Sequence, residues 1–573
     1  MEYKIETIFK TVEMFELEIT EIKEKTNHIL TYKDKKMNAT LFLQMLKENM
    51  KIREKLHYVV LYGNLGYYKD IHNEEIIQRK KYVDHLQSDI ESTLTFVEKK
   101  IVNLGKEKIE EYAKEVDLSI FKQYIDNLFR LQTHFIREHD QEENKELIDT
   151  IARSLEEYNT LLHQIHFGKL EIEEEQIELD FTNYARYLSD TREDVRAKTY
   201  HLVHSALSKE KERFASILNT IYQCRVQMSH LKGFSSVLEQ NLFEENINST
   251  LFTSVLKEVH NHIPCMQSYL QWRLKNVQIQ NPHIWDLNVP ISNYTPEYTL
   301  EEALQVSKKV FSTFGPTYKE TFLKLIEDHH VETLLNEKKH QMITFSWDSY
   351  AFMNFHGKFI DLKNLVHEGG HIVGAYLSKK QPYLYEDSTV FVGELASLSN
   401  ELSLLTILFK EASTNEEKKF FLGKQVDNYF IHVYKETLIT EFEQILYTEV
   451  QSGGVLTSTF IEDTYQILLK KYYGNEVIYD GLERNGWILC GHIFRHAYYV
   501  YQYVTGYLMA TINIKQMQEN KVTNEEYISF LSSGSNTYSL DLLKKIKIDL
   551  SDEKQLQESF DWFDENVKVL KRM

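Results

Sequence analysis

The sequence has 573 residues, of which 42% are hydrophobic and 13% aromatic, and this composition excludes an intrinsically disordered chain. Its formal net charge of −20 is spread along the whole length, which argues against a nucleic-acid backbone as partner. We therefore expect an ordered globular protein with a large buried core and no nucleic-acid partner.

The amino-terminal stretch "MEYKIETIFKTVEMFELEIT" has apolar residues at helical period and lacks the apolar core and cleavage site of a secretion signal. Cys224, Cys265 and Cys490 have no metal-ligand spacing and are expected to be free thiols. Both observations favour a cytoplasmic location. The richest apolar run, residues 497–512, contains five tyrosines and a glutamine, so we expect no membrane span.

The first 263 residues contain no proline and repeat apolar residues at helical spacing, as in "TLFLQMLKENMKIREKLHYVVLYGNLGYY". We expect long stacked helices there. The stretch "QNPHIWDLNVPISNYTPEYT" has three prolines and predicts an irregular connection, after which "LEEALQVSKKVFSTFG" returns to helical period.

Residues 341–357, "QMITFSWDSYAFMNFHG", are rich in β-branched and aromatic residues and predict a small β-sheet. The stretch "KFIDLKNLVHEGGHIVGAYLSKKQP" follows at once, with apolar residues at helical spacing and a stop at Lys379, Lys380 and Pro382. The sheet and the helix are therefore expected to be neighbours in the chain.

This predicted helix carries His367, Glu368 and His371. Residues i and i+4 lie on one face of a helix, so the two imidazoles can reach one cation while Glu368 points beside it. A catalytic zinc site needs a third protein ligand, and Glu394 opens a helical segment 23 residues after His371. We predict one zinc ion per chain, bound by His367, His371 and Glu394. The metzincin pattern is excluded because position 377 is leucine.

Ser397 and Glu401 fall on the same helical face as Glu394, where we expect them to hydrogen-bond the ligand imidazoles. The zinc helix also contains Gly369 and Gly370, although a mid-helix glycine costs about 1 kcal/mol relative to alanine. Our hypothesis is that Gly370 allows the helix of Glu394, or a strand of substrate, to come close.

The motifs "HEGGH" and "ELASLSNE" resemble the H-E-x-G-H and E-x-x-S-x-x-x-E patterns of the thimet oligopeptidase and oligoendopeptidase F family of zinc metallopeptidases. The resemblance covers roughly residues 200 to 570 and includes "YAFMNFHGKFIDLKNLVHE" and "YYVYQYVTGYLMA". It implies a mostly α-helical, two-lobed bowl, or clamshell, with a deep substrate channel, the predicted small β-sheet lying beside the zinc-binding helix. We assign residues 1–200 to an amino-terminal helical lobe and residues 201–573 to the zinc metallopeptidase catalytic region.

In such a mechanism zinc acts as a Lewis acid, and Glu368 is the general base that takes a proton from water and returns it to the departing amine. Within "CGHIFRHAYYVYQYVTGYLMA", His492, His496, Tyr499 and Tyr503 follow i, i+4, i+7 and i+11 and predict one helical stripe. The resemblance implies that a histidine and tyrosines of this region hold the oxyanion, and we assign His492, Tyr499 and Tyr503. Tyr498, Tyr501 and His496 are the alternatives.

The function that these patterns favour is a zinc metalloendopeptidase that cleaves short unfolded peptides, which are its expected partners; the patterns leave the oligomeric state open. One alternative is an exopeptidase, either a dipeptidyl carboxypeptidase or an aminopeptidase, although the G-x-M-E-N element of a large aminopeptidase class is absent from "AFMNF". Another is a peptide-binding protein without catalysis on the same scaffold. Peptides blocked at both ends would distinguish endopeptidase from exopeptidase.

Overall fold

The computed structural model describes residues 1–340 and 344–573 and is mostly helical, with two small sheets. The chain forms two compact units, each built from three separate segments. Unit 1 comprises Met1–Thr133, Pro296–Thr389 and Thr523–Ile546, and unit 2 comprises His134–Thr295, Val390–Val522 and Lys547–Met573. The division at residue 200 into a helical lobe and a catalytic region stays a prediction.

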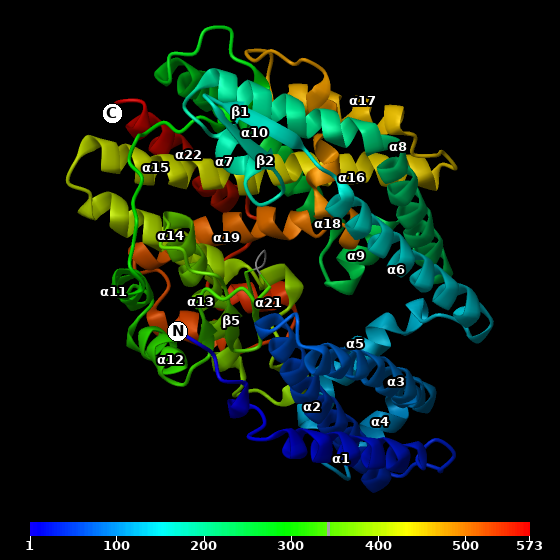
Figure 1. The fold of residues 1–573 in the computed structure, drawn as a ribbon. Coiled ribbons are helices and arrows are strands. Elements are labelled where there is room, and N and C mark those ends of the chain that lie inside the picture. Colours follow the sequence, from blue (N-terminus) through cyan, green and yellow to red (C-terminus); the bar gives the residue numbers. More distant parts are fainter. Residues whose placement is uncertain (341–343) are drawn as a thin grey trace. The chain divides into compact units, whose positions relative to one another are not determined.

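Unit 1 combines long amino-terminal helices with a small sheet and the helices around it (Figure 1). Its helices are α1 (Val12–Leu30), α2 (Ala39–Lys69), α3 (Glu74–Leu104), α4 (Lys106–Tyr112), α5 (Lys122–Leu131), α11 (Leu300–Ser312), α12 (Pro316–Glu327), α13 (Phe359–Ser378), α20 (Asn524–Leu531) and α21 (Ser539–Lys544). The predicted helices over residues 40–68 and 300–315 are thus confirmed as α2 and α11.

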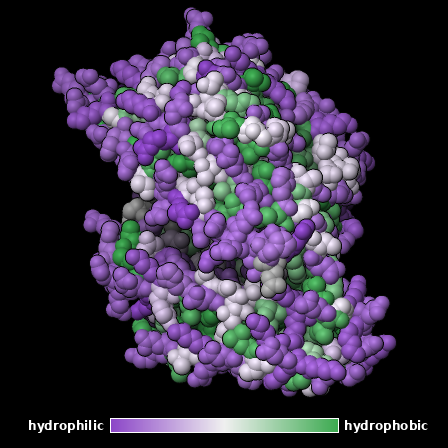
Figure 2. Space-filling model, turned by 90° about the vertical axis from the view of Figure 1, so that its right-hand side faces the viewer, coloured by the Kyte–Doolittle hydropathy of each residue, from purple (hydrophilic) through white to green (hydrophobic). Residues whose placement is uncertain are grey.

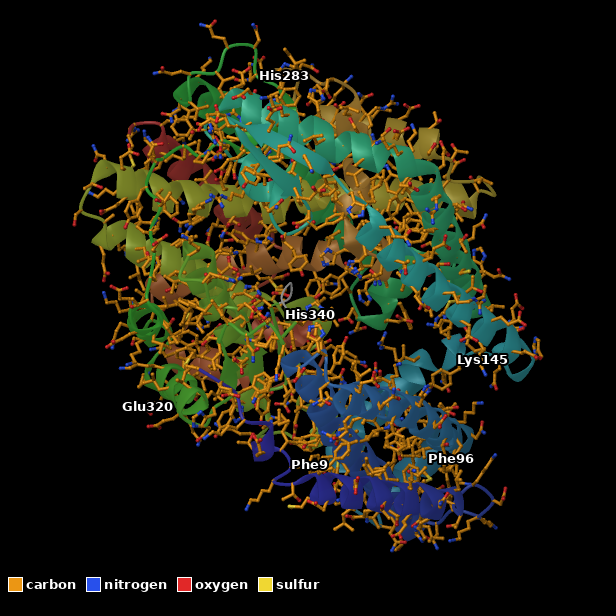
Figure 3. All side chains as sticks on the ribbon, viewed as in Figure 1. Phe9, Phe96, Lys145, His283, Glu320 and His340 are labelled. Atoms are coloured by element: carbon orange, nitrogen blue, oxygen red, sulfur yellow. The ribbon has the colours of Figure 1, made fainter. Side chains whose placement is uncertain are left out.

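Aromatic residues join the amino-terminal helices of unit 1. Asn38 caps α2 by accepting a hydrogen bond from the backbone N–H of Leu41. Phe9, labelled in Figure 3, sets its ring edge-on against Phe15 of α1 and Tyr62 of α2, at centroid distances of 5.8 and 5.5 Å. Such edge-to-face pairs fix the packing of α1 on α2.

The predicted small sheet is present beside α13. Strands β3 (Val331–Glu332), β4 (Phe345–Trp347) and β5 (Tyr350–Phe352) lie in the order β3-β5-β4, with β3 parallel and β4 antiparallel to β5. Both β4 and β5 contact α13. The sheet is shorter than predicted, part of the predicted stretch, residues 341–343, lies outside the described residues, and β3 adds a strand that no alternating pattern indicates.

Unit 2 is a larger helical assembly in which α19 packs against α14, α16 and α22 (Figure 1). Its helices are α6 (Gln141–Gln164), α7 (Tyr184–Leu188), α8 (Glu193–Leu231), α9 (Val237–Glu244), α10 (Ser249–Asn276), α14 (Leu395–Glu411), α15 (Asn415–Tyr429), α16 (Glu436–Gln451), α17 (Ser458–Tyr473), α18 (Gly491–Arg495), α19 (Val500–Gln518) and α22 (Glu553–Leu570). The predicted irregular connection at residues 280–299 is confirmed apart from a short 3₁₀ turn, Ile284–Asn288.

A β-hairpin in unit 2 differs from the expectation of a purely helical amino-terminal half. Strands β1 (Gly168–Ile172) and β2 (Glu175–Leu179) pair in antiparallel register, Gly168 opposite Leu179. Leu170 and Leu179 are buried, and β1 packs on α8. The apolar face against α8 therefore decides the structure of a glutamate-rich segment whose residues favour helix.

In the part of the chain that the structure describes, one helical segment, Val390–Glu411, is long and apolar enough to cross a membrane by length and composition alone. It includes α14, and 72% of its apolar stretch is buried inside the protein, as in the core helix of a globular unit. The face drawn in Figure 2 carries mainly hydrophilic side chains with scattered hydrophobic ones. The three cysteines are free thiols, as predicted.

Candidate active site

The helix that carries the HEGGH motif is anchored at its amino-terminal end by Asp361. The carboxylate of Asp361 accepts hydrogen bonds from the backbone N–H groups of Lys358 and His356, both at 2.9 Å. These bonds satisfy donors at the helix start and place a negative charge at the positive end of the helix dipole. The first turn of α13 is therefore fixed.

The other end of α13 is tied to the turn between β4 and β5. Lys379, the residue that caps α13, lies 2.8 Å from the buried carboxylate of Asp348, and His57 of α2 lies 3.2 Å from the second oxygen. Burial alone would raise the pKa of Asp348, but the bonds to His57 and Lys379 hold that pKa well below its usual range. The sheet and α2 thus fix the position of α13 within unit 1.

His367 and His371 lie on one face of α13, as the spacing predicts. Their Nε2 atoms are 3.3 Å apart and their ring centroids 5.0 Å apart, and both side chains are half-buried. Glu368, between them in sequence, is only 8% exposed. Two imidazole nitrogens at this separation can direct their lone pairs at one cation.

Close packing explains why the first of the two adjacent glycines, Gly369, is a glycine. A Cβ at this position would lie 2.6 Å from the ring of Phe311 on α11 and 3.1 Å from the ring of Phe322 on α12. A Cβ contact of 2.6 Å is essentially never found in proteins, so the glycine allows α13 to pack directly on α11 and α12. The hypothesis for Gly370 stays a prediction.

Glu394 stands at the start of α14, as predicted, and Ser397 holds its side chain. The Ser397 hydroxyl lies 2.9 Å from the carboxylate Oε2 and 2.9 Å from the backbone oxygen of Glu394. We predicted a Ser397 bond to an imidazole, whereas the observed bond orients the carboxylate. Glu401 is buried and accepts a hydrogen bond from Asn428 at 3.1 Å. Its role toward an imidazole stays a prediction.

The predicted stripe of His492, His496, Tyr499 and Tyr503 is not one continuous helix. Helix α18 ends at Arg495, Tyr498 has a left-handed backbone with φ of 54°, and α19 begins at Val500. Nevertheless the rings gather: His492 is parallel to Tyr499 at 5.5 Å, and Tyr499 is edge-on to Tyr503 at 5.5 Å.

Tyr499 and Tyr503 lie beside Glu394 within unit 2. Burial raises the pKa of both tyrosines, and the negative charge of Glu394 raises it further. Desolvation by the surrounding protein lowers the pKa of His492, and the positive charge of Arg495 lowers it further. At neutral pH the tyrosines are therefore protonated hydrogen-bond donors.

The alternative tyrosines belong to the core of unit 2. Tyr498 is 2% exposed and stacks on Tyr447 at 5.4 Å, and Tyr501 is 1% exposed against Phe252 at 4.7 Å. The ring of His496 lies 5.7 Å from that of Tyr499. The register of "YYVYQY" therefore directs Tyr499 and Tyr503, rather than Tyr498 and Tyr501, toward Glu394.

His432 is a residue near this cluster that sequence reasoning missed. It lies in a π-helical turn, Phe430–Lys435, with its ring parallel to Tyr507 at 5.2 Å and 6.0 Å from the ring of Tyr503. π-helical turns often occur at functional sites. His432 was not singled out from the sequence because it stands outside the metal-ligand motifs and the tyrosine-rich stretch.

Within residues 1–340 and 344–573, His367, His371 and Glu394 form a candidate metal-binding group, and all three are half-buried. Two neutral imidazoles and one carboxylate are the donor set of catalytic His₂Glu zinc sites, which keep a fourth position for water or substrate. Acidic Glu368 beside the histidines supplies a proton acceptor of the kind that such sites require. The residues present therefore fit a catalytic zinc ion.

Comparison with known proteins assigns the chain to a peptidase family. Residues 186–562 match the profile of peptidase family M3, and the chain belongs to this family of metallopeptidases. Among curated proteins, oligopeptidase PepF of Bacillus subtilis is 25% identical over 100% of this chain and 87% of its own length. An oligoendopeptidase F homolog of Lactococcus lactis is 24% identical over 100% of this chain and 97% of its own length.

Solved structures show the same fold. The crystal structure of oligoendopeptidase-F from Enterococcus faecium superimposes with a TM-score of 0.77 at 22% identity and covers 98% of both chains. The fold is therefore that of the M3 peptidases, and the resemblance inferred from the motifs is confirmed.

Proposed function

We propose that this protein is a zinc-dependent endopeptidase that hydrolyses internal peptide bonds of short unfolded peptides. The observation that carries the proposal is the pair of imidazole nitrogens 3.3 Å apart on α13, with buried Glu368 beside them and Glu394 available as third ligand. Membership of family M3 and the oligopeptidase names of the relatives support it.

His367, His371 and Glu394 would hold one zinc ion per chain. When bound, zinc supplies a Lewis acid that polarises the scissile carbonyl and makes water more acidic. Ser397 orients the Glu394 carboxylate for this task, because a ligand held by a further hydrogen bond loses less freedom on binding.

Glu368 acts as the general base and then as the general acid. Its carboxylate takes a proton from the attacking water, and the same proton passes to the amine that leaves as the peptide bond breaks. A buried carboxylate suits this role because little bulk water competes for the proton.

Tyr499, Tyr503 and His492 stabilise the oxyanion and hold the substrate backbone. Their rings form one cluster, and the raised pKa of each tyrosine keeps its hydroxyl protonated, so both can donate to a developing negative charge. The expected clamshell with its deep channel would admit extended peptides and exclude folded chains. We also propose that the protein is located in the cytoplasm.

Metal analysis paired with Glu368→Gln tests the function. The purified wild-type protein should hold about one zinc per chain and cleave an internally quenched peptide that is blocked at both ends. Glu368→Gln should keep the zinc and lose hydrolysis. Cleavage only of peptides with a free terminus would favour the exopeptidase, and a well-folded protein that binds peptides without zinc would favour the non-catalytic binder.

A further inference from the structure

Residues 496–499, which we name the connector, join α18 to α19 and contain one residue in an unfavourable backbone conformation. Tyr498 has φ of 54°, in the left-handed region, where a bulky aromatic residue is rarely found. Such a conformation is unfavourable and persists only where the surrounding structure imposes it. The next residue is Tyr499.

Two elements of unit 2 bond the backbone of this connector, and a third bonds the end of α18 that precedes it. Glu443 of α16 accepts a hydrogen bond from the backbone N–H of Tyr498 at 3.1 Å, and Asn241 of α9 donates to the carbonyl of Ala497 at 3.3 Å. Arg225 of α8 donates to the last carbonyls of α18, those of Ile493 at 3.2 Å and Phe494 at 2.6 Å.

Helices α8 and α16 also hold the side chain of Tyr498, through the ring of Tyr447. Arg225 donates to the hydroxyl of Tyr447 at 3.1 Å, and the Tyr447 ring lies between those of Tyr222, at 4.0 Å, and Tyr498, at 5.4 Å. Glu443 is 0% exposed, and its Oε2 has no hydrogen-bond partner within residues 1–340 and 344–573. A buried carboxyl group that accepts a hydrogen bond from a strained backbone N–H, with its other oxygen unbonded in the described part of the chain, is costly unless it serves that backbone.

We propose that Glu443, supported by Arg225 and Asn241, is a positioning residue that fixes the connector and so aims the Tyr499 hydroxyl at the substrate oxyanion. The inference rests on the proposed peptidase function. Residue 498 is fixed by Glu443 and residue 500 begins α19, so the backbone of Tyr499 has little freedom. Without the Glu443 bond, Tyr498 can return to an ordinary backbone region, and the direction of Tyr499 changes.

The test is a double-mutant cycle between Glu443 and Tyr499, read in kcat and KM on a quenched peptide. Glu443→Leu should lower kcat by about a hundredfold with little change in KM, because a misplaced donor acts on the transition state. Glu443→Gln keeps an acceptor for the Tyr498 N–H and should retain most of the activity. In a Tyr499→Phe background, Glu443→Leu should have almost no further effect.

Two variants separate positioning from general destabilisation. Glu462→Leu removes another buried acidic side chain of unit 2, which pairs with Lys211 of α8 at 2.8 Å, and should leave kcat unchanged. If Glu443→Leu does not fold, Asn241→Ala removes only the bond to Ala497 and should lower kcat by a smaller factor, again only when Tyr499 is present.

A readout without catalysis keeps this inference separate from the proposed function. With 3-fluorotyrosine at position 499, the fluorine resonance should shift or broaden in Glu443→Leu and not in Glu443→Gln. Unchanged kcat and an unchanged resonance in Glu443→Leu would overturn the inference, as would additive losses in the cycle. If the wild type hydrolyses no peptide, the proposed function fails, and the fluorine spectrum still decides the role of Glu443.

Discussion

Tyr499 and Tyr503 have polar neighbours, whereas the other tyrosines of the same segment are packed in the core of unit 2. Both lie beside Glu394 and His492, whereas Tyr501, two residues from each, is buried and its hydroxyl has no hydrogen-bond partner in the described part of the chain. Identical side chains in one segment therefore offer a matched comparison of catalytic and packing roles.

Removal of single tyrosine hydroxyls should show this difference. We expect Tyr499→Phe and Tyr503→Phe each to lower kcat by about a hundredfold, because each loses one donor to the oxyanion. Tyr501→Phe should leave kcat unchanged, since the lost hydroxyl makes no bond. Steady-state kinetics on one peptide decide the matter, and an equal loss in Tyr501→Phe would contradict the assigned register.

Ser397 gives a second residue-scale prediction, which concerns metal affinity. Ser397→Ala removes the hydrogen bond to the Glu394 carboxylate and should weaken zinc binding by about tenfold or more. Ser399→Ala is the control, because Ser399 is buried on the same helix but bonds Asn513 at 3.3 Å. Competition with a chelator measures both affinities, and equal values would show that Ser397 does not orient the ligand.

At the scale of elements, the zinc helix depends on how closely it packs on α11 and α12. Gly369 faces Phe311, which is itself fully buried and stacked on Phe322 at 3.9 Å. The Phe311 ring cannot move aside without disturbing this stack. Gly374, on the same helix, has its nearest neighbour, Leu531, at 4.0 Å from an added Cβ.

Alanine at these two glycines should therefore act in opposite directions. Gly369→Ala should destabilise the protein by about 1–3 kcal/mol through overpacking. Gly374→Ala fits without a clash and gains helix propensity of up to about 1 kcal/mol. Thermal unfolding should give a lower Tm for the first variant and an equal or higher Tm for the second. Similar shifts in both would mean that Gly369 is not a packing requirement.

Elements fixed by local geometry could be predicted from the sequence, and elements fixed by distant contacts could not. The predicted zinc helix ends within a few residues of Ser378, and His367 and His371 face each other because an i, i+4 spacing requires it. The break at the connector was not predictable, since it depends on Glu443, 55 residues away in the chain. The β1–β2 hairpin depends in the same way on burial against α8.

The free energy of unfolding of the whole molecule depends on pH through the buried carboxyl group of Glu443. Burial raises the pKa of Glu443 to about 8, although the Tyr498 N–H and Arg225 oppose this shift, whereas a glutamate in an unfolded chain titrates near about 4.3. Between these values the folded chain keeps a proton that the unfolded chain releases. The free energy of unfolding therefore decreases as pH rises through this window.

Glu443→Gln cannot titrate, and its Tm should fall less than that of the wild type between about pH 6 and about pH 8. The difference corresponds to roughly 2 kcal/mol, since each pH unit in the window contributes about 1.4 kcal/mol at most. Calorimetric scans of both proteins across this range measure it. Parallel curves would show that Glu443 is already ionised in the folded protein at pH 6.

The alternation of segments between the two units has a consequence for biosynthesis. The first 133 residues leave the ribosome well before residues 296–389 and 523–546, with which they share unit 1. Apolar faces of this early segment therefore stay exposed to solvent until the later segments of unit 1 have been translated. Neither unit is encoded by one continuous stretch of the gene. Any fragment made by a single cut therefore contains at least one incomplete unit.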